Sequence, residues 1–303
     1  MVSEGGVEVW RGSVNTWECD QMGHMNVRFY VAHAMEGLAT IAGALGLPGA
    51  FRPNANATLI VKDHHIRFLR EARAGAALFM RAGVIAMDEC GARILQLLFH
   101  ADGELATAIQ TQLVHAMAHE ERPFPWSPLT RGRAESLGIE VPARAAPRSL
   151  GLEAPSGGAS LDAAERLDLT RLASGAFGAQ DCDVFGRVLP WQILGRVSDG
   201  VPTLLSAGQP RDPNIGGAVV ELRLAYQTWP RAGDRFDLRS GIAGFDERFR
   251  RVVHWVLDPD TGRAWATGEA MAVALDLTTR KIAASSEASR TSLSAQVIEG
   301  LAL

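Results

Sequence analysis

The chain has 303 residues, 47% of them hydrophobic, which is enough for two domains or one large domain with a sizeable core. Its 30 Lys and Arg residues nearly balance its 34 Asp and Glu residues, which excludes the basic surface of a nucleic-acid-binding protein. No apolar run reaches the roughly 18 residues of a membrane span, and the N-terminus lacks a signal-peptide pattern, so we expect a cytoplasmic protein without membrane association.

The first predicted elements are a strand over residues 7–17 and, after the turn "WECDQMGHMN" (residues 17–26), a helix that runs to Pro48. Within this helix the apolar side chains recur at helical spacing and most other residues are Ala or Gly. We therefore expect it to be buried along much of its length. The apolar residues at helical spacing are Phe29, Met35, Leu38, Ile41 and Leu45.

Four strands are predicted to come next, because long segments rich in Ile, Val, Leu and Phe alternate with turn residues. One of the turns, Asp102-Gly103, is a hairpin signal that has a counterpart at Asp260-Thr261-Gly262. The predicted strands cover residues 57–69, 77–87, 92–100 and 105–117.

The next segment, residues 121–165, is rich in proline and contains Ser156-Gly157-Gly158. Proline at this density prevents long regular elements and favours a stiff, partly extended linker. A short helix fits at Thr130–Leu137, where Pro128 precedes it and Gly138 comes directly after it.

The second half repeats the first. Asp20 and Asp183 are 163 residues apart, and Cys19, Gly23 and Glu36 match Cys182, Gly186 and Asp199 at the same offset. Further on, "REARAGAALFMRAGVIAMDE" aligns with "TWPRAGDRFDLRSGIAGFDE" at an offset of 158. We infer a duplicated module, and the expected order is a domain at 1–120, the linker at 121–165, a domain at 166–285 and a tail at 286–303.

Each module is predicted to be a strand, a long buried helix and four antiparallel strands. This order is α+β rather than alternating α/β, and it is the pattern of a hotdog fold, a curved sheet around one central helix. Two modules in one chain predict a double hotdog, with two antiparallel sheets each wrapped around a central helix.

The turn and the start of the helix resemble a family signature. Asp20, Gly23, His24 and Asn26, with Tyr30 and Glu36 further along, resemble the D-x-x-G-H-x-N…Y…E pattern of 4-hydroxybenzoyl-CoA thioesterase-like acyl-CoA thioesterases. The segments "HHIRFLREARAG", "YQTWPRAGD" and "ERPFPWSP" agree with that family too. The resemblance implies a hydrolase that cleaves acyl-CoA in lipid metabolism without a cofactor. Because that family is similar in fold to acyl-ACP thioesterases, it leaves the carrier open.

Asp20 is the first candidate for the catalytic carboxylate. An aspartate at a strand-to-helix turn can attack the thioester carbonyl or take a proton from water, although Asp is also favoured there as a cap. The start of the helix offers N–H groups near Gly23 and Val27 that can hold the thioester oxygen. Gly23 also lets a substrate approach the backbone closely.

Three more polar residues complete the candidate site. His24 can orient water or donate to the carbonyl, and Asn26 either positions His24 or simply caps the helix. Glu36 needs a partner or solvent in so apolar a helix. The resemblance implies a role as base or nucleophile, and a salt bridge to Arg28 or Arg67 is the structural alternative.

The second module keeps Asp183, Gly186 and Asp199 but has Arg187 and Leu189 where the first has His24 and Asn26. Arg187 can pair with Asp183 or bind a phosphate of CoA. Since hotdog sites lie between two modules, we expect one copy to carry the chemistry while the other shapes the substrate tunnel or binds CoA.

Metal chemistry is not predicted, because Cys19, Cys90 and Cys182 have no metal-ligand spacing and His64 and His65 alternate faces on a strand. Two other functions fit the same fold: a hydratase or dehydratase, and an acyl-CoA-binding protein that has lost catalysis. The expected partner is an acyl-CoA or acyl-ACP substrate, and the chain acts as a monomeric double hotdog or a homo-oligomer.

Overall fold

The computed structural model describes residues 5–206, 214–279, 281–284 and 287–303. The strand, the helix and the four further strands predicted for the first half are all present. The helix is shorter than the sequence suggested because it ends before Gly46, whose positive φ of 95° continues the chain away from the helix axis. The elements are β1 (Val7–Ser13), α1 (Val27–Ala44), β2 (Ala57–Phe68), β3 (Ala77–Met87), β4 (Gly91–His100) and β5 (Leu105–Met117).

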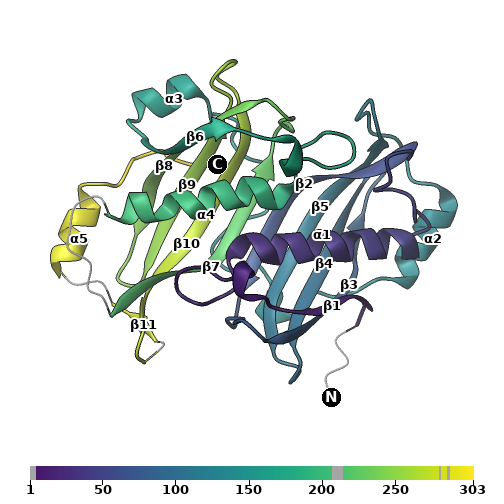
Figure 1. Ribbon diagram of the computed structural model, residues 1–303, viewed down its shortest axis with the longest axis horizontal. Helices are drawn as coiled ribbons and strands as arrows, with labels where there is room; N and C mark the ends of the chain where they lie inside the picture. Colours follow the sequence, from purple (N-terminus) through teal and green to yellow (C-terminus); the bar gives the residue numbers. More distant parts are fainter. Residues whose placement is uncertain (1–4, 207–213, 280, 285–286) are drawn as a thin grey trace. The chain divides into compact units, whose positions relative to one another are not determined.

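The chain divides into two compact units. Unit 1 comprises Met1–Pro147 and Asp183–Gly186, and unit 2 comprises Arg148–Cys182 and Arg187–Leu303. In unit 1 the strands are antiparallel in the order β1-β3-β4-β5-β2, and α1 lies across them (Figure 1).

Unit 2 repeats this arrangement. Its strands run β6-β8-β9-β10-β7, also antiparallel, with α4 across them and β11 paired with β10 (Figure 1). The predicted α+β architecture, one antiparallel sheet and one long helix in each half, is therefore confirmed. The elements are β6 (Thr170–Ala176), α4 (Pro190–Ser206), β7 (Ile215–Tyr226), β8 (Arg235–Phe245), β9 (Phe249–Leu257), β10 (Ala264–Asp276) and β11 (Ile282–Ala283).

Helix α1 buries one side against the sheet of unit 1 and leaves the other side exposed. On the buried side Gly37 permits close packing, since a Cβ there would lie 3.0 Å from both Met80 Sδ and Val9 Cγ2. On the other side Glu36, Ala39 and Thr40 are exposed. Buried residues therefore recur along most of α1, from Tyr30 to Ala42, as expected, but only on this one side of the helix.

The Pro-rich segment covers the opposite face of the unit 1 sheet. It contains α2 (Pro128–Ser136), close to the predicted helix, and a 3₁₀ turn, η2 (Ala143–Ala145). Ile139, Val141 and Ala145 pack against a cluster on β3, β4 and β5. The cluster comprises Leu95, Leu97, Phe99, Leu105 and Ala108, with Phe79 and Ile85 partly buried beside it. The sheet is thus covered on both faces, and this segment is part of a core.

The outer face of the unit 2 sheet is covered in a comparable way. Helix α3 (Leu161–Arg166) and the C-terminal residues after α5 (Glu287–Ser294) pack on it, with Ala164, Leu301 and Trp255 in one cluster. Trp255 Nε1 donates to the carbonyl of Ala302 at 3.1 Å. In the described part of the chain, no helix combines the length and apolar character that a bilayer crossing requires.

Candidate active site

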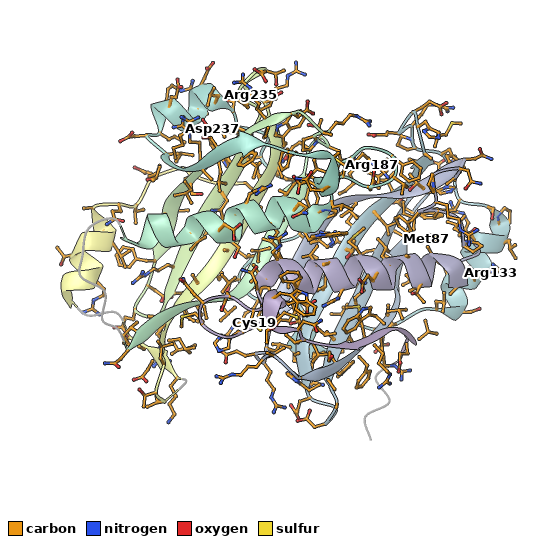
Figure 2. The ribbon with its side chains drawn as sticks, viewed as in Figure 1. Cys19, Met87, Arg133, Arg187, Arg235 and Asp237 are labelled. Atoms are coloured by element: carbon orange, nitrogen blue, oxygen red, sulfur yellow. The ribbon has the colours of Figure 1, made fainter. Side chains whose placement is uncertain are left out.

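The first candidate site is the turn between β1 and α1, which Cys19 marks in Figure 2. A short 3₁₀ helix, η1 (Thr16–Glu18), leads into it, and the backbone N–H of Asp20 donates to the His24 carbonyl at 2.8 Å. Gly23 adopts a positive φ of 75° that closes the turn. The sequence folds this way because a glycine tolerates the left-handed conformation.

Asp20 is exposed in this turn. Its Oδ1 accepts the backbone N–H of Met22 at 2.8 Å and that of His24 at 3.4 Å. Its Oδ2 forms no hydrogen bond or ion pair with any residue that the structure describes. One oxygen is therefore fixed by the turn, as a cap would be, while the second is available to a substrate or a water.

The two backbone groups predicted to hold an oxyanion differ in availability. Gly23 N–H donates to the Asp20 carbonyl at 2.9 Å, so it is already used within the turn. Helix α1 begins at Val27, and Asn26 caps it by accepting the N–H of Arg28 at 3.0 Å. Within the described residues Val27 N–H has no partner, which leaves it as a donor at the positive end of the helix.

His24 is held by two charged residues from the segment after β2. Its Nε2 lies 3.2 Å from Glu71 Oε2 and 3.4 Å from a guanidinium nitrogen of Arg73. The backbones of His24 and Arg73 also form an isolated bridge. Sequence reasoning missed Glu71 because it lies far along the chain from His24, and no local pattern links the two residues.

Tyr30 lies on the first turn of α1 and is buried. Burial, the largest cause, raises the pKa of its phenol well above the usual range. The ring packs edge-on against Phe68 with centroids 5.3 Å apart. Tyr30 is therefore a neutral packing residue, and the carboxylates remain the candidates for chemistry.

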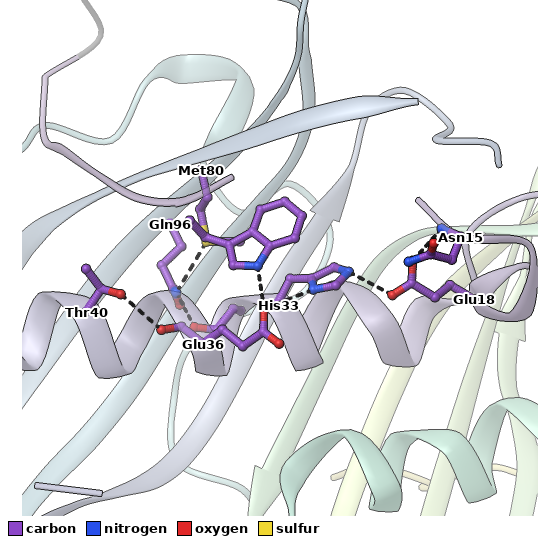
Figure 3. A network of polar contacts seen from close by, with 9 residues as sticks. Asn15, Glu18, His33, Glu36, Thr40, Met80 and Gln96 are labelled. Atoms are coloured by element: carbon purple, nitrogen blue, oxygen red, sulfur yellow. Dashed lines mark hydrogen bonds and ion pairs between the residues drawn. The ribbon is translucent and has the colours of Figure 1, made fainter. Parts of the chain in front are cut away.

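A second polar cluster lies further along α1, around Glu36 (Figure 3). Glu36 Oε2 accepts a hydrogen bond from Trp10 Nε1 and lies 3.3 Å from His33 Nδ1. The other ring nitrogen of His33 lies 3.2 Å from Oε1 of Glu18. The salt bridge of Glu36 to Arg28 or Arg67, the structural alternative, does not form among these described residues. The sequence signal that could have found His33 is its i, i+3 spacing to Glu36.

The two clusters occupy different places on unit 1. Asp20 and His24 precede the first residue of α1, whereas Glu36 lies nine residues after Val27. At ~1.5 Å per residue this separation is about 13 Å along the helix axis. The structure thus keeps Asp20, His24 and Asn26 together and places Glu36 apart from them. No group of three or more His, Cys, Asp or Glu side chains in the described ranges is arranged to hold a metal ion.

The second turn has the same backbone. Asp183 Oδ1 accepts the N–H of Phe185 at 2.8 Å, and Gly186 has a positive φ of 80°. Arg187, which replaces His24, is buried. Asp199 is exposed and forms no hydrogen bond or ion pair with the described residues.

The second unit also has a counterpart of Glu18 and His33. Asp181 and Arg196 stand 163 residues after them, and Arg196 lies 3.4 Å from Asp181 Oδ2. That same oxygen accepts Gly178 N–H at 2.8 Å, as Glu18 Oε2 accepts Asn15 N–H at 2.7 Å. Both units therefore place a basic side chain against a buried carboxylate at this point of the helix.

A family model described as the thioesterase-like superfamily matches residues 14–133 and 177–293. The chain belongs to the thioesterase-like superfamily. The two matched ranges include both turns, both long helices and most of both sheets, so the hotdog fold and its duplication are confirmed. No curated protein sequence matched the chain.

Solved structures of other thioesterase-like proteins share this double hotdog. The putative oleoyl thioesterase of Lactobacillus plantarum has a TM-score of 0.67 at 14% identity, covering 90% of this chain and 98% of its own. The acyl-ACP thioesterase of Bacteroides thetaiotaomicron has a TM-score of 0.65 at 11% identity, and the match covers 87% of this chain and 96% of that protein. The 12:0-ACP thioesterase of Umbellularia californica has a TM-score of 0.64 at 13% identity, and the match covers 88% of this chain and 93% of that protein. At these identities the likeness concerns the fold.

Proposed function

We propose that this protein hydrolyses acyl-CoA thioesters to a carboxylic acid and CoA, with Asp20 as the base or the nucleophile. One observation carries the proposal: Asp20 is exposed, its Oδ1 is fixed by Met22 N–H, and its Oδ2 has no partner in the described part of the chain. A carboxylate held by one oxygen keeps its orientation while the other oxygen reacts. Membership in the thioesterase-like superfamily supports the reaction class.

Two routes use this carboxylate. As a base, Asp20 takes a proton from water, the hydroxide oxygen bonds to the thioester carbon, the C–S bond breaks and the leaving sulfur takes up the proton. As a nucleophile, Asp20 bonds to that carbon as the C–S bond breaks and the thiolate leaves. Water then cleaves the resulting anhydride, which regenerates the carboxylate, and the proton released from the water goes to the thiolate.

The neighbouring groups support either route. Val27 N–H, at the positive end of α1, can hold the thioester oxygen as negative charge develops. Gly23 contributes open space, because a Cβ added there would meet no atom within 4 Å. His24, held by Glu71, orients the carbonyl or the water, and Asn26 keeps the first turn of the helix in place.

Only the first unit has this complete set, so we assign the chemistry to Asp20 rather than Asp183. The second turn has the same backbone, but Arg187 and Leu189 replace His24 and Asn26. Asp183→Asn is therefore the matched control for Asp20→Asn, since both changes remove a carboxylate from the same kind of turn.

The test is thiol release from a panel of acyl-CoA and acyl-ACP substrates. We expect Asp20→Asn to lower kcat by at least about 100-fold, the usual effect of losing a catalytic acid–base group, and Asp183→Asn to change it little. Equal losses would refute the assignment to one turn. Hydration of an enoyl-CoA, or tight binding without thiol release, would instead show a hydratase or a binding protein.

A further inference from the structure

His33 is enclosed by groups from three elements of unit 1 (Figure 3). Its Nε2 faces Glu18 Oε1 from η1 at 3.2 Å, and its Nδ1 faces Glu36 Oε2 on α1 at 3.3 Å. Its ring packs against Trp10 of β1 with centroids 4.3 Å apart. The residue is only 8% exposed. Within the described residues, no other charged group contacts it.

These contacts fix the ring beside Glu36. The ring nitrogen that forms a hydrogen bond with a carboxylate is Nδ1, and its partner is Glu36 Oε2. Nε2 lies close to Glu18 Oε1 but forms no hydrogen bond with the described residues. A ring that carries its proton on Nδ1 therefore donates to Glu36. In unit 2, Arg196 lies at the matching place beside Asp181.

Glu36 is held on one side only. Both of its side-chain contacts, from Trp10 Nε1 and His33 Nδ1, fall on Oε2. Its Oε1 has no partner in the part of the chain that the structure describes, and the side chain is 60% exposed. This leaves one oriented oxygen facing solvent, about 13 Å along the helix from the residue that starts α1.

We propose that His33 is a positioning residue that donates from Nδ1 to Glu36 Oε2 and so places Oε1 to accept the distal amide N–H or the hydroxyl of the pantetheine arm of the substrate. The inference rests on the proposed function. Glu36 lies on α1, apart from the turn that holds Asp20, so we place this contact away from the reacting carbon. An unsubstituted acyl chain offers no donor to a carboxylate, whereas the pantetheine arm, which CoA and acyl carrier protein share, carries amide N–H groups and a hydroxyl.

Kinetics on two substrates with the same acyl group test this contact. One is an acyl-CoA, and the other is the acyl-N-acetylcysteamine thioester, which lacks the distal amide and the hydroxyl of the arm. We expect Glu36→Gln and His33→Gln each to raise KM for acyl-CoA about tenfold, the loss of one charge-assisted hydrogen bond. We expect kcat, and both constants for the truncated substrate, to stay near wild type.

Two variants separate positioning from folding. His33→Arg keeps N–H donors beside Glu36, as Arg196 does beside Asp181 in unit 2, and should retain most of the affinity for acyl-CoA. Arg196→Gln removes the matching cation of unit 2 and should lower stability without changing KM. Unchanged KM in both Glu36→Gln and His33→Gln, or an equal rise on the truncated substrate, would overturn the proposal.

A spectroscopic measurement keeps the hydrogen bond to Glu36 testable if no thioester is hydrolysed. In ¹⁵N NMR of the histidine rings, Nδ1 of His33 should be protonated in the wild type, and its chemical shift should change in Glu36→Gln. An unprotonated Nδ1 in the wild type would refute the donor role of His33. Absence of thiol release with the expected spectrum would refute only the proposed function.

Discussion

The buried carboxylate of Glu221 on β7 accepts the backbone N–H of Arg148 at 2.9 Å. The N–H of Ser149 donates to its second oxygen, also at 2.9 Å. Two residues along β7, Arg223 donates to the carbonyl of Gly151 at 3.1 Å. An acid and a base on one strand therefore fix the segment that enters unit 2.

We expect Glu221→Gln to destabilise the protein by about 1–3 kcal/mol, because the amide NH₂ would face backbone donors and leave one of them unsatisfied. Glu165→Gln, an exposed change on α3, is the control and should have little effect. Urea unfolding monitored by tryptophan fluorescence gives both values. A Glu221→Gln midpoint equal to wild type would show that the contact contributes nothing.

The pH dependence of stability should reflect His254. Burial lowers the pKa of His254 from 6.5 to about 4, and its Nδ1 lies 2.7 Å from the Ser240 hydroxyl. Between these values the unfolded chain binds a proton that the folded chain does not. Its contribution to the free energy of unfolding therefore falls as pH drops from 6.5 towards 4, by about 1.4 kcal/mol per unit.

The variant that isolates this group is His254→Gln, since Gln96 occupies the matching strand position in unit 1. It should reduce the slope of unfolding free energy against pH by about one proton in this window. His64, whose pKa burial lowers from 6.5 to about 3, keeps its own share of the slope. Identical slopes in wild type and His254→Gln would contradict the expectation.

Gly23 and Gly186 make a matched pair for testing the two turns. Both have a positive φ, 75° and 80°, so Ala at either position should cost about 1–2 kcal/mol. Thermal unfolding measures this cost. Because Gly23 shapes the turn that fixes Asp20, only Gly23→Ala should also lower thiol release. A loss of activity in Gly186→Ala of the same size would argue for two working turns.

Asn26 caps α1 through its Oδ1 and the N–H of Arg28. Asn26→Ala should destabilise by about 1 kcal/mol, while Asn26→Ser should restore most of this because Ser is a comparable cap. Thiol release by Asn26→Ser decides between capping and a direct role. Full activity would mean that capping is the whole function of Asn26, and low activity in a stable variant would show a contact with substrate or His24.

The strands and the order of elements could be predicted because alternating apolar residues and turn signals are local properties of the chain. The turn at Asp20 was equally predictable, since Gly23 and Asn26 have positional meaning on their own. The cluster at His33 could not be predicted in this way. It depends on η1, which brings Glu18 within 3.2 Å of His33, 15 residues later, and no periodicity in the sequence shows this contact.

The solvent exposure of one side of α1 could not be predicted from the sequence either. Ala39 and Thr40 suit a buried helix and an exposed one equally well, so composition could not reveal that α1 keeps Glu36 in contact with water. The partner of His24 was missed for a related reason. Glu71 follows β2, and the backbone bridge between His24 and Arg73 that brings this segment to His24 is visible only in the structure.

A fragment of this protein needs the residues that pack on the outer face of β4, which are Ile139, Val141 and Ala145. A fragment that stops at residue 120 would leave Leu95, Leu97 and Phe99 facing water and should aggregate during expression. A fragment that extends to Pro147 takes its own cover with it. Engineers who wish to exchange or tag the halves should therefore place the junction next to Arg148, and treat the prolines before it as belonging to the first half.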